Sequence, residues 1–175
     1  KLAMGDCAIN LGYEDTLDKE GNVVLSAAQK LAEVAIETAN TAKVFGIDPK
    51  VAMLSFSTKG SGKGPQVDLV RNATEIVKAK CPDMLIDGEM QFDAAVSPEV
   101  GQLKFPGSPV AGYANTFIFP EIQSGNIGYK IAARLGGFAA YGPILQGLNA
   151  PINDLSRGCN AEEVYQMSII TAGLA

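Results

Sequence analysis

The sequence predicts an α/β fold, a three-layer α/β/α sandwich in which helices cover both faces of a mostly parallel sheet. Short apolar segments alternate along the chain with longer segments whose apolar residues recur every three or four positions, a rhythm typical of alternating strands and helices. The segments between successive strands are long enough to hold a helix that returns over the sheet. With 175 residues, the chain can also bury its own core.

The predicted strands are short apolar segments. They span residues 2–6, 51–56, 84–86, 115–119 and 139–141. A polar stretch at residues 11–25 precedes the first helix, and its centre, residues 18–22, consists of turn-forming residue types. We therefore expect a surface excursion with a small hairpin at this place.

The first predicted helix has signals at both of its ends. Ser26 and Gln29 match the capping-box pattern that starts a helix, and Gly46 follows its last apolar positions. Apolar residues at helical spacing predict further helices at residues 67–80, 122–135 and 161–172. In such folds, ligands bind at the carboxyl ends of the strands, so we look for chemistry in the loops that follow them.

The composition excludes several classes of function. The chain has no histidine, so any proton transfer must use Asp, Glu, Tyr, Lys or Cys. Its net charge of −5 argues against nucleic acid as a partner, and no apolar run is long enough to cross a membrane. Cys7, Cys81 and Cys159 are too widely spaced for a zinc site or a disulfide framework, and they suit a reducing cytoplasm. Because Lys1 is not an initiator methionine, we expect a piece of a longer chain.

Two of these loops carry charged residues. The loop at residues 58–64 offers backbone N–H groups and two lysines to an anion, or it is an ordinary flexible loop. Asp87, Glu89 and Asp93 follow the strand predicted at residues 84–86. Such carboxylates can hold a hard metal ion or act as an acid–base pair, but turn capping is the favoured role here, and we expect no metal site.

The helix at residues 122–135 presents two cations. Lys130 and Arg134 are four positions apart and share one face, and Tyr129 and Tyr141 lie near them in the sequence. Cations beside aromatic rings suit a ligand that carries phosphates and a planar base. The alternative is that the two cations belong to an ordinary solvated face of the helix. This alternative is less favoured because the helix is otherwise rich in glycine and alanine.

The loop before the last helix holds the most informative residues. Ser156 supplies a hydroxyl that can donate to an anionic sulfur or oxygen, and Arg157 supplies a positive charge for a developing oxyanion. Glu163, in the first turn of the helix, can accept a proton at a site without histidine. Spacing alone favours a different role for Glu163, a capping box with Asn160.

A series of motifs runs through nearly the whole chain. It comprises Asp6-Cys7-Ala8, Ser55-Phe56-Ser57-Thr58-Lys59-Gly60-Ser61, Asp87-Gly88-Glu89-Met90-Gln91-Phe92-Asp93-Ala94-Ala95, Phe119-Pro120, Gly125-Asn126-Ile127-Gly128-Tyr129-Lys130, and the two runs Gly142-Pro143-Ile144-Leu145-Gln146-Gly147-Leu148 and Pro151-Ile152-Asn153-Asp154-Leu155-Ser156-Arg157-Gly158-Cys159. Together these motifs closely resemble the phosphate acetyltransferase family, also called phosphotransacetylases, over roughly the C-terminal half of its chain. Residues 11–25 depart from the resemblance, because the excursion is longer than in the family.

The resemblance implies an enzyme of two α/β/α domains with its active site in the cleft between them. The enzyme moves an acetyl group between phosphate and coenzyme A, so coenzyme A, acetyl phosphate and phosphate are the expected partners, with no bound cofactor and no metal in the chemical step. Residues 1–141 would be most of the second domain, and residues 142–175 would return to the absent first domain. The resemblance also suggests a homodimer, the cysteine content suits a cytoplasmic location, and the fragment alone is expected to be inactive.

The resemblance assigns roles by position. Ser156 would orient or stabilise the coenzyme A thiolate, and Arg157 would stabilise charge on the acetyl phosphate or the transition state. Arg134 would help to hold substrate or coenzyme A, and Tyr129 and Lys130 would line the coenzyme A path.

Glu163 departs from the family, whose base at this position is an aspartate. Glutamate is one methylene longer, so the same proton transfer requires a shifted geometry, and Glu162 is a nearby competitor. Three alternatives stand beside the main hypothesis. They are the acetyl-CoA-binding regulatory module at the end of some malic enzymes, a butyryl-specific relative, and a non-catalytic module whose last helix mediates assembly.

Overall fold

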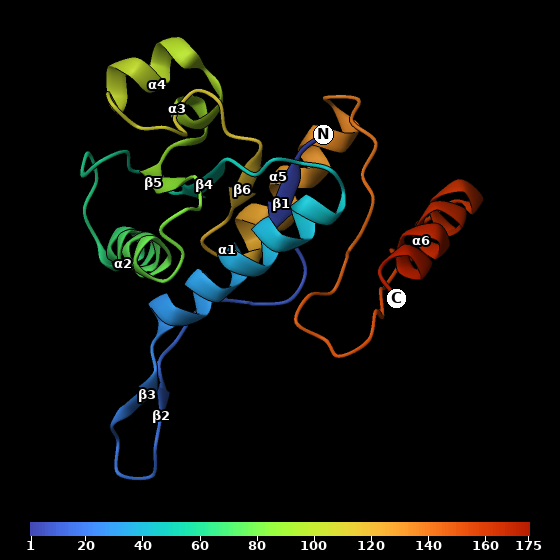
Figure 1. Cartoon of the computed structure of the whole chain (residues 1–175), viewed down its shortest axis with the longest axis horizontal. Helices are drawn as coiled ribbons and strands as arrows, with labels where there is room; N and C mark the ends of the chain where they lie inside the picture. Colours follow the sequence, from blue (N-terminus) through green and yellow to red (C-terminus); the bar gives the residue numbers. More distant parts are fainter. The chain divides into compact units, whose positions relative to one another are not determined.

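The computed structural model describes all residues of the chain, Lys1–Ala175. The chain divides into two compact units, Lys1–Gly125 and Asn126–Ala175. The first unit contains a parallel sheet flanked by helices (Figure 1), and the second contains most of α5 (Ile122–Arg134) and all of α6 (Ala161–Gly173). This architecture confirms the predicted α/β class. None of the helices combines the length and the hydropathy that a membrane crossing requires.

The sheet has four strands in the order β1-β6-β4-β5, and every neighbouring pair is parallel. The strands are β1 (Ala3–Gly5), β4 (Val51–Leu54), β5 (Ile86–Met90) and β6 (Thr116–Ile118). Val51 of β4 pairs with Ile86 on one side and Thr116 on the other, and all four residues of β4 are buried. Because the strands are parallel, their carboxyl ends open at one edge of the sheet.

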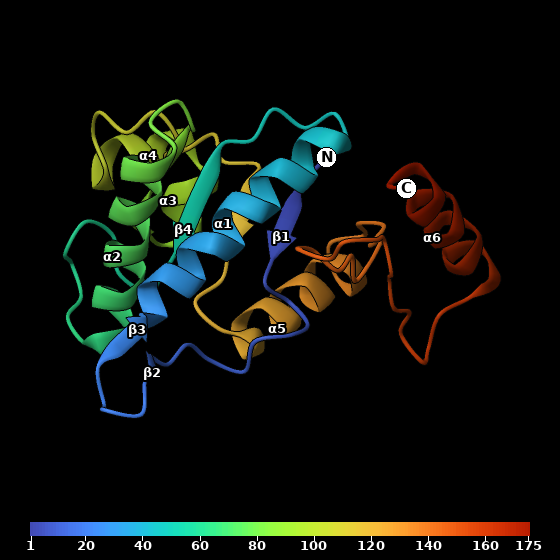
Figure 2. The ribbon, with the colours of Figure 1, turned by 60° about the horizontal axis from the view of Figure 1, so that its bottom comes forward.

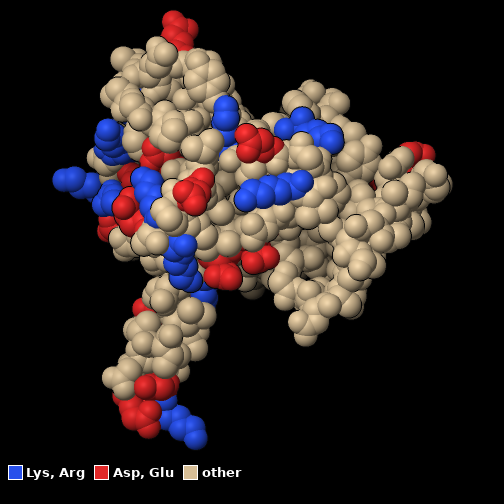
Figure 3. Space-filling model, viewed as in Figure 1, with Lys and Arg blue, Asp and Glu red and all other residues tan.

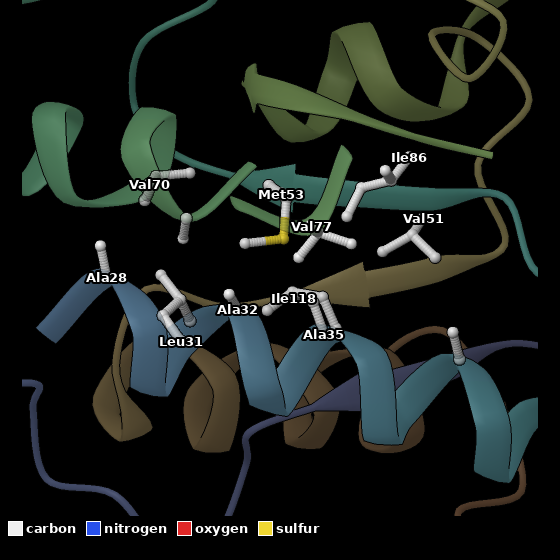
Figure 4. Close-up of a cluster of buried hydrophobic side chains, with 12 residues drawn as sticks. Ala28, Leu31, Ala32, Ala35, Val51, Met53, Val70, Val77, Ile86 and Ile118 are labelled. Carbon is white, nitrogen blue, oxygen red and sulfur yellow. The ribbon is translucent and has the colours of Figure 1, made fainter. Parts of the chain in front are cut away.

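One face of the sheet is covered by α1 (Ala27–Val44) and α2 (Pro65–Lys80), which pack side by side (Figure 2). Val51 and Met53 of β4 point into this layer (Figure 4). Small side chains on α1 let the helix lie close to the strands, as dense core packing requires. This core also contains Ala28, Leu31, Ala32, Ala35, Val70, Val77, Ile86 and Ile118.

The opposite face carries a second core, because successive strand residues point to opposite sides of a sheet. Ala52 and Leu54 of β4 lie in it together with Phe117 of β6. Its cover consists of the short helix α3 (Phe92–Val96) and residues from the segment 105–114. The sheet therefore has a cover on each face, which gives the three layers predicted from the sequence.

The start of the first helix and the hairpin before it are also confirmed. Ser26 Oγ accepts a hydrogen bond from the N–H of Gln29, and Gln29 Oε1 accepts one from the N–H of Ser26, which completes the capping box. The hairpin consists of the antiparallel strands β2 (Thr16–Leu17) and β3 (Val23–Leu25). Charged side chains gather at its tip (Figure 3).

The strand predicted at residues 84–86 is displaced. In the structure, β5 begins at the last of these residues and continues for four more, so Asp87 and Glu89 lie within the strand and not after it. The sheet tolerates these carboxylates because Lys78 pairs with Asp87, and Glu89 accepts hydrogen bonds from neighbouring groups. The strand predicted at residues 51–56 likewise ends two residues early, at the end of β4.

The prediction of a strand at residues 139–141 is wrong. These residues form no regular structure and are all exposed, so they have no apolar side to bury against a neighbouring strand. Two short helices, α3 and α4 (Pro98–Lys104), were not predicted. They have five and seven residues, too few to show a helical period in the sequence.

Candidate active site

The glycine-rich loop after β4 is held by a buried carboxylate. Glu89 accepts hydrogen bonds from Ser57 Oγ at 2.9 Å, from the N–H of Gly60 at 2.7 Å and from Arg71 Nε at 3.3 Å. Ser57 Oγ in turn accepts a hydrogen bond from the N–H of Gly62 at 2.9 Å. The Gly60 N–H is one of the groups that the sequence predicted to bind an external anion. It is already occupied by the Glu89 carboxylate of the protein itself.

The other two carboxylates of this cluster have separate partners. Asp87 pairs with Lys78 at 3.0 Å, and Asp93 pairs with Lys104 at 2.7 Å. Each aspartate also accepts a hydrogen bond from the backbone N–H of the residue that follows it. These contacts support the structural interpretation of the cluster, and no group of three or more acidic or cysteine side chains gathers in a metal-binding arrangement.

The loop after β1 contains a cysteine that is unsuited to nucleophilic attack. Burial, together with the nearby charge of Asp6, raises the pKa of the Cys7 thiol to about 12. The thiolate is the nucleophilic form of cysteine, so Cys7 is almost wholly unreactive near neutral pH. A covalent acyl-enzyme on this residue is therefore disfavoured.

The start of α5 is held by a glutamate and by a close backbone contact. Glu121 precedes the helix and accepts hydrogen bonds from the N–H groups of Gln123 at 2.7 Å and Ser124 at 2.8 Å. Burial favours the neutral acid, but these hydrogen bonds outweigh it and hold the pKa of Glu121 below its ordinary value. Gly125 lies against the backbone of Asp6, where any side chain would clash with the Asp6 carbonyl oxygen.

The distal half of α5 carries three of the predicted site residues, Tyr129, Lys130 and Arg134. Lys130 Nζ donates a hydrogen bond to Asn126 Oδ1 at 2.8 Å and lies 5.7 Å from the centroid of the Tyr129 ring. Lys130 and Arg134 are exposed and form no ion pair, so both charges are available to an anionic ligand. Tyr141 lies in the irregular segment after this helix, apart from the other three in the sequence, and is exposed.

The remaining predicted site residues lie at the start of α6. Ser156 and Arg157 belong to a turn in which Ser156 Oγ accepts a hydrogen bond from the N–H of Gly158 at 3.3 Å. Glu163 forms the capping box with Asn160, because its Oε2 accepts from the Asn160 N–H at 3.0 Å while Asn160 Oδ1 accepts from the Glu163 N–H at 2.9 Å. The capping role expected from the spacing is thus confirmed. The carboxylate keeps its second oxygen, Oε1, for other partners.

A groove lies beside this group, between α6 and the segment at residues 151–155. It has a volume of about 480 Å³. Its walls include Leu155, Val164 and Met167, with Asn153 and Thr171 joined by a hydrogen bond of 2.8 Å between Asn153 Nδ2 and Thr171 Oγ1.

The seven predicted site residues thus lie in two stretches of the chain, one on and after α5 and one at and before the start of α6. Sequence reasoning missed the role of Glu89 and its partner Arg71. An acidic residue inside an otherwise apolar strand was the available signal, because a carboxylate is rarely buried without partners.

Comparison with known proteins places the chain in a family. Residues 23–172 match the family described as phosphate acetyl/butaryl transferase. The chain belongs to this family. It is 56% identical over 175 residues to the phosphate acetyltransferase of Bacillus subtilis, with which it aligns over 100% of its own length and 50% of the relative's. The phosphate acetyltransferase of Staphylococcus epidermidis is 53% identical over 98% of this chain and 50% of the relative.

Solved structures of similar proteins have the same fold. A phosphotransacetylase from Streptococcus pyogenes is 62% identical, with a TM-score of 0.84 over 96% of this chain and 47% of that one. A branched-chain phosphotransacylase from Enterococcus faecalis is 24% identical, with a TM-score of 0.69 over 97% of this chain and 58% of that one, and it shows the fold alone. The present chain spans about half the length of the curated relatives it matches.

Proposed function

We propose that this chain is the C-terminal half of a phosphate acetyltransferase, which reversibly transfers an acetyl group between acetyl phosphate and coenzyme A. The observation that carries the proposal is the 53–56% identity, over at least 98% of the chain, to relatives named phosphate acetyltransferase. The two groups of site residues supply the chemistry that such a transfer needs: cations for phosphate, a hydroxyl, and a carboxylate that can act as a base.

The proposed reaction is a single displacement. Glu163 takes the proton of the coenzyme A thiol, and the thiolate sulfur attacks the acetyl carbonyl carbon. The new carbon–sulfur bond forms, the bond from that carbon to the phosphate oxygen breaks, and phosphate leaves with the electron pair. Ser156 orients the thiolate, and Arg157 stabilises the negative charge that develops on the acetyl oxygen or the phosphate.

A carboxylate is a weak base for a thiol, whose ordinary pKa is about 8.5. The exposed guanidinium of Arg157, in the turn just before α6, would assist by stabilising the thiolate. Capping does not compete with this role, because it uses Glu163 Oε2 and leaves Oε1 to receive the proton.

Binding of the substrates is proposed for the α5 group. Lys130 and Arg134 offer unpaired positive charges four residues apart, suited to the phosphates of coenzyme A or to acetyl phosphate. Tyr129 supplies an aromatic ring whose centroid lies 5.7 Å from Lys130 Nζ, and Tyr141 is proposed to supply a second aromatic surface for the ligand. Coenzyme A acts as a substrate here, and the proposed chemistry uses no further cofactor and no metal.

We further propose that residues 1–141 form most of the second domain of the enzyme and that residues 142–175 pack on its first domain. The exposed apolar side chains of the C-terminal segment support this arrangement, since α6 buries only Met167 and leaves Val164, Tyr165 and Ile169 largely exposed. In this arrangement, the first domain would pack into the groove beside α6. A cytoplasmic homodimer belongs to the same proposal and rests on the family resemblance.

The alternatives are less well supported. The curated relatives in which more than half of the aligned residues are identical are named phosphate acetyltransferases, which favours the acetyl enzyme over a butyryl-specific one and over a regulatory module of a malic enzyme.

The test is a coupled assay of the full-length protein with acetyl phosphate and coenzyme A. Glu163→Gln preserves the capping box, since glutamine also caps at this position, and removes only the basicity. We expect its kcat to fall by about 10²- to 10⁴-fold, the usual contribution of a general base. The kcat of Ser156→Ala should be lower by at least about tenfold, because one hydrogen bond to a charged group is lost.

Two matched variants serve as controls. Glu162→Gln changes the neighbouring carboxylate, and Ser168→Ala removes an exposed hydroxyl on the same helix that bonds only to the Val164 carbonyl. Both should retain nearly full activity. Full activity of Ser156→Ala and Glu163→Gln would refute the catalytic assignments, and a loss confined to Glu162→Gln would move the base to that residue.

A further inference from the structure

The loop after β4 is held in one conformation from two sides. Glu89, only 2% exposed, binds Ser57 and the Gly60 N–H through its side chain, and its main-chain carbonyl accepts a hydrogen bond from the N–H of Lys59 at 3.1 Å. Thr58, buried beside it, accepts a hydrogen bond through Oγ1 from the N–H of Gln91 at 2.9 Å. The end of β5 therefore fixes the residues immediately before and after Lys59.

Lys59 has an unusual backbone conformation. Its φ is +47°, and it is the only residue other than glycine with a positive φ. Side-chain-bearing residues adopt this conformation at a cost, and they retain it where the surroundings enforce it, frequently at functional sites. The contacts of Glu89 and Thr58 are the surroundings that enforce it here.

The side chain of Lys59 carries a free charge. Its ammonium lies 5.0 Å from the centroid of the Phe105 ring, and it forms no ion pair. The nearby lysines differ, because Lys78 and Lys104 each bind a carboxylate. An aromatic face steadies the cation without neutralising it. Lys59 is thus an oriented, unpaired cation at the edge where parallel sheets bind their ligands.

We propose that Lys59 binds a phosphate group of a substrate and that Glu89 is the positioning residue that sets its direction. This inference rests on the proposed function, in which both coenzyme A and acetyl phosphate carry phosphate groups. It assigns a role to a cation of the loop after β4, in addition to the roles proposed for Lys130, Arg134 and Arg157. Glu89 acts only through the loop and touches no substrate.

The test measures dissociation constants of the full-length protein by calorimetry, with coenzyme A and inorganic phosphate as separate probes. Lys59→Gln should weaken binding of one probe by about three- to tenfold, the loss expected for one charge-assisted contact. Lys59→Arg should retain most of the affinity. Lys63→Gln is the matched control, since Lys63 is an exposed lysine of the same loop with no fixing contact and should bind as the wild type does.

The positioning role is tested by a double-mutant cycle. Glu89→Gln should weaken the same probe, and Lys59→Gln should add little further loss in that background, because both changes remove one interaction. Independent, additive losses would contradict the positioning role. Should Glu89→Gln fail to fold, the exposed Lys59 variants still decide the binding role.

A loss for coenzyme A alone would identify its phosphates as the group bound, and a loss for inorganic phosphate alone would identify the phosphate of acetyl phosphate. Unchanged affinity of Lys59→Gln for both probes, or an equal loss in Lys63→Gln, would overturn the inference. The acetyl-transfer assay of the wild type remains separate, so phosphate binding without acetyl transfer would refute the proposed function and leave the role of Lys59 standing.

Discussion

Two carboxylates are buried in this protein, those of Asp87 and Glu89, and both lie on β5. Burial favours the neutral form of Glu89. The hydrogen bonds from the Gly60 N–H, Arg71 and Ser57 nevertheless outweigh that effect and hold the pKa of Glu89 below its ordinary value. The folded protein therefore binds a proton at Glu89 less readily than the unfolded chain does, and the charged form stabilises the loop after β4.

This shift predicts a pH dependence of stability. A carboxyl whose pKa is lower in the folded state stabilises the fold above its unfolded pKa, about 4.3 for glutamate, and the gain is lost as the pH falls toward the folded pKa. Glu89→Gln should lower the free energy of unfolding by about 1–3 kcal/mol at pH 7. The difference from the wild type should shrink as the pH falls from about 5 to about 3.

Urea denaturation across this pH range measures the effect. Glu20→Gln is the control, because that carboxylate is exposed at the hairpin tip and has no partner, so its variant should match the wild type throughout. A difference between Glu89→Gln and the wild type that stayed constant from neutral to acid pH would contradict the assignment.

At the scale of elements, the position of α5 depends on a close approach between helix and loop. Gly125 is the buried residue of this helix, and its Cα faces the carbonyl oxygen of Asp6. The helix start is fixed by Glu121. Tyr129, Lys130 and Arg134 lie further along the same helix.

Gly125→Ala should therefore destabilise the protein. The added methyl group would clash with backbone and force the helix away, and overpacking of this kind costs about 1–3 kcal/mol. Gly173→Ala is the matched helical control, because a methyl group there meets nothing within 4 Å. That change should leave stability unchanged or raise it by up to about 1 kcal/mol. Thermal unfolding of the two variants makes the comparison, and equal stability would show that the contact at Gly125 does not hold α5.

At the scale of the whole molecule, the chain offers few guanidinium groups to the phosphates of the proposed substrates. It has three arginines, Arg71, Arg134 and Arg157. Arg71 is already engaged by Asp68 and Glu89. Only two guanidinium groups are left for substrates, in keeping with the proposal that a further domain completes the active site.

The 175-residue chain by itself should consequently form no measurable acetyl-CoA from acetyl phosphate and coenzyme A. The full-length protein, assayed at the same molar concentration, is the positive control and should be active. Acetyl-CoA formation by the isolated chain, abolished by Glu163→Gln, would show that the site is complete within these residues.

The parts of the fold that could be predicted are those that depend on local sequence signals. The capping box at Ser26 and the hairpin around residues 18–22 depend on residues a few positions apart, so both were recognised correctly. The strand at residues 84–86 was misplaced because β5 is defined by its pairing with β4, more than thirty positions away. Residues 139–141 are apolar enough for a strand, but no neighbouring strand pairs with them.

The sequence by itself determined the α/β class, the starts of the two helices that have a capping box and the identity of the candidate residues, because these depend on local pattern and on motifs. Only the tertiary structure decided what Glu89 does. Its partners Ser57 and Gly60 are 32 and 29 positions away, and they meet it because two parallel strands end at the same edge of the sheet. The same arrangement fixes the backbone around Lys59 and leaves its side chain without an ion pair. The Glu89 carboxylate binds the Ser57 hydroxyl and the Gly60 N–H of the loop, so the charge of Lys59 remains free.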